Sequence, residues 1–231
     1  MGDLVAFDGE LYRLIPSRFP PVPVYEGLVA NDRLEALVEV ENRTNPRLRS
    51  ESRLLDAYPD PLASRLQNWN LAPFKYLNPE GSRFFDPTRP ALELGDDRQT
   101  ALAVSVARRQ AFLARTGEAP IGLDMRMLRT PVRGRFFDFR HVSTHLDREQ
   151  RWAIGASVPE SADGVLFHPP ERPSATCAAV LRGDALGRTI QTSHYRFVWN
   201  GARISMLYAF DDRGTALLPD QLSEAADALA A

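Results

Sequence analysis

The sequence predicts an α+β fold in one domain, and three observations support this. Strand-like segments lie between helix-like segments without the regular alternation of a doubly wound parallel sheet. Residues 195–210 have the pattern of a β-hairpin around Asn200-Gly201. The 231 residues suffice for one sizeable core, and no linker divides them. We therefore expect a single domain over residues 1–231, with twisted antiparallel or mixed sheets and flanking helices. Its core should span about residues 11–210, and residues 211–231 should form a tail ending in a helix.

The first third of the chain contains few regular elements. Leu11–Ile15 has the pattern of a short strand that ends at Pro16. Residues 16–24 hold four prolines, which favour an extended segment because proline restricts its own φ and the residue before it. Asn31 is a suitable cap for a helix over residues 32–42, and a short helix is expected over residues 61–66.

The rest of the chain contains both strands and helices, in no regular order. A helix from Asp96 or Asp97 to about Arg115 is the clearest element, because apolar residues recur at helical spacing, acidic residues start it and Gly117 follows it. The segment 140–146 is predicted to be a loop, and further helices are expected over residues 147–156 and 220–230. Strands are expected over residues 91–94, 121–128, 134–139, 164–167, 175–181, 195–199 and 203–210.

Composition and charge argue against several classes of function and site. The net charge of −2 gives no electrostatic case for nucleic acid binding. The one cysteine, Cys177, rules out an intrachain disulfide and a cysteine-based zinc site. His141 and His145 are four residues apart but lie in a predicted loop, so we expect no metal site. The start of the chain has no signal-peptide pattern, and no apolar run approaches the ~20 residues of a membrane span. We expect a cytoplasmic protein without a membrane partner; a homo-oligomer is compatible with the sequence.

Two arginines stand in contexts that favour anion binding. Arg13 lies within the apolar strand Leu11–Ile15, and Arg83 lies between Gly81-Ser82 and Phe84-Phe85. An arginine beside glycine can approach a phosphate closely, and its planar fork suits a bidentate contact. The alternative for each is an ion pair with an acidic residue.

The order and spacing of several segments resemble the longer members of the RES family of bacterial toxins. The resemblance covers about residues 11–210, and no single motif carries it. Its first segments are Leu11-Tyr-Arg-Leu-Ile-Pro-Ser-Arg-Phe-Pro20, Glu41-Asn-Arg-Thr-Asn-Pro-Arg-Leu-Arg49 and Asn78-Pro-Glu-Gly-Ser-Arg-Phe84. It continues through Asp96–Leu113, Leu123-Asp-Met-Arg126, Asp138-Phe-Arg140, Asp163-Gly-Val-Leu-Phe167 and Cys177-Ala-Ala-Val180.

This resemblance implies a mixed α/β domain related in shape to ADP-ribosyltransferase toxins. Family members consume NAD+, as glycohydrolases, phosphorolytic enzymes or ADP-ribosyltransferases, and are commonly paired with a helical antitoxin that carries an Xre-like domain. No tightly bound cofactor is implied, and NAD+ is expected as substrate or ligand. The family arginine matches Arg83, which would bind the pyrophosphate or nearby groups, with Ser82 and Arg13 as further substrate-binding candidates.

The other catalytic positions of the family are substituted. The family tyrosine falls at Glu93, the glutamate at Val104, a histidine at Arg108 and the serine at about Pro169. Cleavage of the nicotinamide–ribose bond develops positive charge on the ribose, which a carboxylate stabilises and valine does not. Arg108 would oppose that charge, although it could bind another phosphate.

Three hypotheses remain open from the sequence. The first is a catalytically degenerate RES domain that retains a nucleotide-binding cleft, with Arg13 and Arg83 lining it and Val104 in its wall. The second is an active NAD+-consuming toxin in which Glu93 replaces the missing carboxylate; Glu171 and Asp163 are the next alternatives for that role. The third is a non-catalytic interaction protein.

Overall fold

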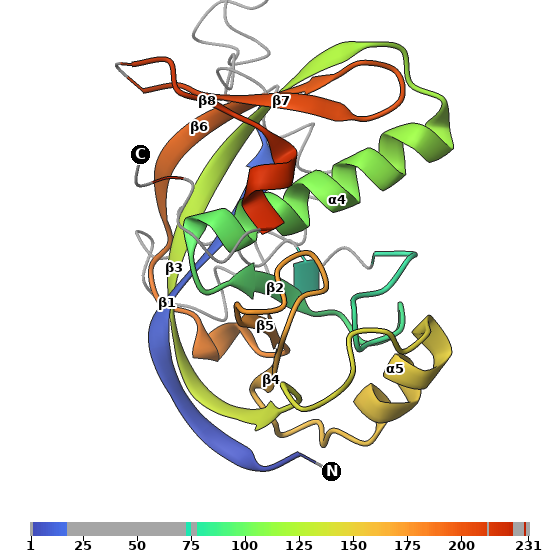
Figure 1. Ribbon diagram of the computed structural model, residues 1–231. Coiled ribbons are helices and arrows are strands. Elements are labelled where there is room, and N and C mark those ends of the chain that lie inside the picture. Colours follow the sequence, from blue (N-terminus) through green and yellow to red (C-terminus); the bar gives the residue numbers. More distant parts are fainter. Residues whose placement is uncertain (1, 18–72, 75–77, 212, 224–228, 230–231) are drawn as a thin grey trace, which may run out of the picture.

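A computed structural model describes residues 2–17, 73–74, 78–211, 213–223 and 229. These residues combine helices with one mixed eight-stranded sheet, so the α+β class is confirmed (Figure 1). The extended segment expected after Ser17 and the helices expected over residues 32–42 and 61–66 lie outside the described residues. Of the expected C-terminal helix, the described part is a 3-10 turn, η3 (Pro219–Ser223).

Five strands pair in a closed ring, which is the frame of the molecule. Going around it, the strands are β1 (Leu4–Pro16), β2 (Leu92–Gly95), β5 (Cys177–Val180), β4 (Gly164–Phe167) and β3 (Ile121–Asp138). The long pairing of β1 with β3 closes the ring; β3 and β4 run parallel, whereas the other neighbours are antiparallel. Leu11, Leu92, Leu94, Phe136 and Leu166 belong to the apolar cluster of the ring.

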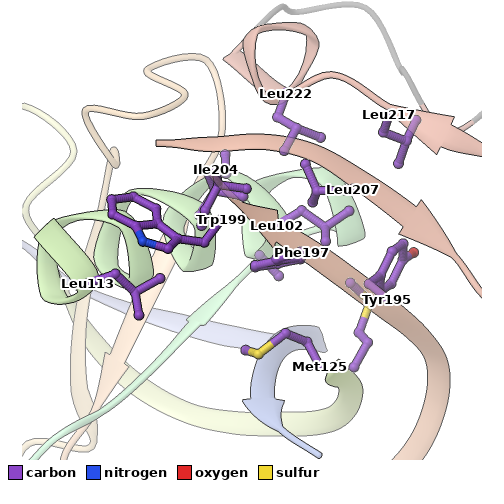
Figure 2. Packing of buried hydrophobic residues seen from close by; sticks show 14 residues of the cluster. Leu102, Leu113, Met125, Tyr195, Phe197, Trp199, Ile204, Leu207, Leu217 and Leu222 are labelled. Carbon is purple, nitrogen blue, oxygen red and sulfur yellow. The ribbon is translucent and has the colours of Figure 1, made fainter. Parts of the chain in front are cut away.

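The sheet continues beyond the ring along the edge of β3 that faces away from β1. On this edge β4 pairs with residues 136–138 and β6 (Ile190–Trp199) pairs with residues 121–129. The next strands of the sheet are β6, β7 (Ile204–Ala209) and β8 (Ala216–Leu217), all antiparallel to their neighbours. A short 3-10 turn, η2 (Gly183–Ala185), precedes β6. Helix α4 (Arg98–Thr116) packs on these strands through Leu102 and Leu113, against Phe197, Trp199 and Leu207 (Figure 2). Burial of each such apolar side chain stabilises the folded state by about 1.5–3 kcal/mol.

The helix boundaries follow from their caps. The Asp97 side chain accepts a hydrogen bond from Thr100 N at 2.6 Å, and Gly117, with φ 63°, ends α4 in the left-handed conformation. Asp147 forms a capping box with Gln150 and starts α5 (Arg148–Ala156). Both helices therefore begin and end within about a residue of the sequence expectation.

Strand boundaries differ from the expectation most clearly in three places, one of which is β6, which begins at Ile190 and not at Tyr195. The segments 121–128 and 134–139 belong to the single strand β3, and the short strand expected at Leu11–Ile15 begins already at Leu4 and includes Pro16. Pro131 does not interrupt β3, because its carbonyl accepts a hydrogen bond from Gly187 N at 2.7 Å. The C=O and N of one residue point to the same side of a strand, so the missing N–H of Pro131 faces away from β1.

The predicted hairpin of β6 and β7 is confirmed, but the prediction of a two-residue turn at Asn200-Gly201 is wrong. Trp199 pairs with Ile204 after a register shift, so the connection runs from Asn200 to Arg203. The Asn200 side chain accepts hydrogen bonds from the backbone N–H groups of Ala202 and Arg203, at 3.0 and 2.8 Å. This side chain stabilises a wider turn than the one Asn-Gly favours.

Candidate functional site

The candidate site lies on the outer face of the ring, where α4 crosses the strands. Glu93 pairs with Ala179 and Gly95 with Cys177, while Leu92 and Leu94 point into the ring. Because side chains alternate along a strand, Glu93 points out of the ring. In Figure 1, α4 runs between the β6–β7 hairpin and the short strands β2, β5 and β4. Glu93 is therefore directed toward α4.

Arg83 reaches this face from a turn that Asn78 and Gly81 form. Gly81 has φ 67° and donates its N–H to Asn78 O at 2.8 Å, a conformation that favours glycine. The Arg83 guanidinium lies 5.8 Å from the ring centre of Phe167 and 6.0 Å from that of Phe84. Its Nη2 donates to Thr144 O at 3.1 Å.

The guanidinium of Arg83 has no carboxylate partner among the residues that the structure describes. The Nε atom of Arg83 is buried and has no hydrogen-bond acceptor among the described residues. Burial and the nearby Arg151 lower the pKa of Arg83, while the carboxylate of Glu171 opposes that shift. A half-buried guanidinium with a free donor beside a second cation is suited to bind an anion.

Glu93 and Arg108 form an ion pair across β2 and α4. The Glu93 side chain is 5% exposed and that of Arg108 is 56% exposed. The other oxygen of the Glu93 carboxylate accepts a hydrogen bond from Arg83 N at 2.7 Å. Glu93 thus fixes the backbone of Arg83, and its own charge is compensated by Arg108.

Ser82, Glu93 and Arg108 line one small cavity of about 70 Å³, together with residues of the turn before β2. The Ser82 hydroxyl accepts a hydrogen bond from Phe85 N at 3.2 Å, and Trp152 Nε1 donates to Ser82 O at 3.0 Å. Ser82 therefore stabilises the turn that carries Arg83. The cavity joins three of the predicted site residues but is too small to enclose a whole dinucleotide.

The positions at which the family resemblance leads us to expect a carboxylate and a serine hold apolar groups. Val104 is partly buried and packs against the cluster that contains Phe84, Phe167 and Cys177. Pro169 is buried directly after β4, and its carbonyl accepts a hydrogen bond from Arg172 N at 3.2 Å. Val104 lines neither of the two cavities beside α4, and neither position supplies a hydrogen-bonding side chain.

Comparison with known proteins decides the family. The RES domain family model matches residues 62–200. This chain belongs to the RES domain family. It is 72% identical over 228 residues, covering 99% of both chains, to "Uncharacterized protein y4oC" of Sinorhizobium fredii (strain NBRC 101917 / NGR234).

Arg13 lies apart from the other site residues of this RES domain. It shares the face of β1 with Leu11, a member of the ring cluster, whereas Tyr12 and Leu14 pack against the α4 cluster. Burial lowers the pKa of Arg13 to about 10. Since Arg83 lies against Phe84 and Phe167 on the outer face, the structure does not bring Arg13 and Arg83 together.

Two further arginines support the site and were missed in the sequence. Arg151, on α5, donates from Nε to Arg83 O at 3.0 Å. Arg172 is buried and pairs with Asp97, the cap of α4, and with Thr100 Oγ1 at 2.9 Å. The sequence places Arg151 on a helix and Arg172 in a loop, but neither pattern indicates the distant partner.

The part of the chain that the structure describes holds no cluster of three or more histidine, cysteine, aspartate or glutamate side chains suited to a metal ion. None of its helices is both long and apolar enough to cross a membrane. Cys177 is a buried thiol whose pKa is raised by burial, so at neutral pH it is protonated and a poor nucleophile.

Proposed function

We propose that this RES domain binds an NAD-like dinucleotide around Arg83 and does not cleave it. The observation that carries the proposal is the state of Arg83: a guanidinium with a free buried Nε, no carboxylate partner among the described residues, and Arg151 beside it. Phosphate groups of a dinucleotide would supply the missing negative charge. The choice of NAD rather than another phosphate ester rests on the family.

The absence of cleavage follows from the side chains around Arg83. Val104 cannot stabilise the positive charge that develops on the ribose when the nicotinamide leaves. Glu93 carries a carboxylate, but that group is held by Arg108 and by Arg83 N. Loss of one such electrostatic contact costs roughly 3–4 kcal/mol of transition-state stabilisation, or about a thousandfold in rate.

Titration calorimetry with NAD+ tests the binding. The Arg83→Gln variant should bind at least about tenfold more weakly than the wild type, since a hydrogen bond to a charged group contributes roughly 1.5–3 kcal/mol. Arg133→Gln is a matched control, because Arg133 is exposed and pairs with Asp8 on the β1–β3 ribbon. Unchanged affinity in a folded Arg83→Gln variant, or no binding by the wild type, would contradict the proposal.

A second candidate function is an active NAD+-consuming toxin that uses Glu93. The direction of its side chain favours this candidate, because Glu93 lines a cavity with Ser82 on the face that carries Arg83. Arg108 would have to move for the carboxylate to act on a substrate. Loss of NAD+ from solution that disappears in a Glu93→Ala variant would establish this function instead.

The toxin–antitoxin lineage is also part of the proposal and rests on family membership. A helical antitoxin with an Xre-like domain would be its protein partner, and the cytoplasm is where we predict that the two meet. Co-purification of the tagged protein with such a partner tests this pairing.

A further inference from the structure

A second and larger cavity lies beside α4. It has a volume of about 320 Å³, and α4 forms one wall through Ala103, Val106, Ala107 and Gln110. Around the helix, Val104 lies between Ala107 on this side and Arg108 on the side of Glu93. The two cavities therefore flank the position at which the family carboxylate is missing.

Glu171 is one of the two acidic residues that line this cavity; the other is Asp220, and Arg203 is the basic residue in the lining. The carboxylate of Glu171 forms no hydrogen bond or ion pair with any described residue. The same carboxylate raises the pKa values of Arg83 and Arg151, against the larger lowering by burial, and so lies within electrostatic range of both. The cavity thus offers negative charge within electrostatic range of the cationic Arg83 and Arg151.

The loop that carries Glu171 is well fixed. The neighbouring Arg172 is buried and pairs with Asp97 at the start of α4. His168 and Ala175 close the loop through a hydrogen bond of 2.5 Å between the imidazole Nδ1 and the carbonyl oxygen. These contacts of neighbouring residues hold the loop in place, and none of them uses the carboxylate of Glu171.

We propose that Glu171 selects the oxidised dinucleotide by contacting its cationic nicotinamide ring, with the small side chains of α4 as the apolar wall. This inference rests on the proposed binding of an NAD-like ligand around Arg83. NAD+ and NADH carry the same phosphates, but the nicotinamide ring is positively charged only in NAD+. A partly exposed carboxylate should favour the charged ring by about fivefold in affinity.

The test measures the affinities of the wild type for NAD+, NADH and ADP-ribose. We expect NAD+ to bind about fivefold more tightly than NADH. In Glu171→Gln the two affinities should become equal, while that for ADP-ribose, which lacks the ring, should not change. Glu160→Gln, which alters an exposed carboxylate in the loop after α5, is the matched control and should keep the wild-type ratio.

Different results separate the two proposals. Binding of both dinucleotides with equal affinity by the wild type, or an unchanged ratio in Glu171→Gln, would overturn the role of Glu171 alone. Asp220 also lines the cavity, so a ratio lost in Asp220→Asn and kept in Glu171→Gln would assign the selection to Asp220. No binding of any of the three nucleotides would overturn the proposed function and this inference together.

Discussion

At the scale of single residues, the Glu93–Arg108 pair is the most informative contact. Each residue stands at a position where the resemblance expects a different catalytic type, and each compensates the charge of the other. The sequence predicted Glu93 as a replacement catalyst and Arg108 as a phosphate ligand. It gave no sign of their pairing, because the contact depends on how α4 lies across β2.

We predict that Arg108→Ala lowers the free energy of unfolding by about 1–2 kcal/mol, because it leaves a carboxylate that is 5% exposed without its counter-charge. Adding Glu93→Gln to this variant should restore part of the loss. Chemical denaturation of the two single variants and the double variant measures the coupling.

Arg115 provides the control on the same helix. It pairs with Glu80, and both side chains are about half exposed. Arg115→Ala should therefore change the free energy of unfolding by less than about 0.5 kcal/mol. Equal effects of the Arg108 and Arg115 substitutions would show that the buried Glu93 charge is unimportant for stability.

At the scale of elements, local signals predicted the helices better than the strands. Asp97, Gly117 and Asp147 determine the ends of α4 and α5 by contacts within a few residues, and these residues are visible in the sequence. The sequence predicted two strands, over residues 121–128 and 134–139, but β3 continues through Pro131 between them, where Gly187 N donates a hydrogen bond to the Pro131 carbonyl. That partner is distant in the sequence, so the continuous strand was not predictable from local pattern.

The end of β3 should make stability depend on pH. Arg140 donates hydrogen bonds to Asp138 and lowers the pKa of its carboxyl to about 2, from 3.8 in the unfolded chain. Because the folded pKa is depressed, this contribution is fully present above about pH 4 and is lost as the pH falls toward about 2.

In thermal denaturation, the melting temperature of Asp138→Asn should therefore fall less steeply than that of the wild type between these two pH values. Arg140→Gln should flatten the curve in the same way, since it removes the donor. Parallel curves for the wild type and both variants would refute the contribution of this pair.

At the scale of the whole molecule, the ring of strands and α4 bring together residues from four separate segments. Arg83 precedes β2, Glu93 lies on β2, Arg108 lies on α4 and Glu171 follows β4. The family resemblance predicted Arg83 and the loss at Val104. It did not predict Arg151, Arg172 or the cavity beside Glu171, because these depend on long-range packing.

We propose, above all, that the protein binds a dinucleotide around Arg83 without breaking it. The most direct measurement follows the concentration of NAD+ for several hours in a solution of the purified protein, with binding measured on the same sample. We predict measurable binding and no loss of NAD+ beyond the buffer control. Loss of NAD+ with the wild type that the Glu93→Ala variant abolishes would contradict the claim.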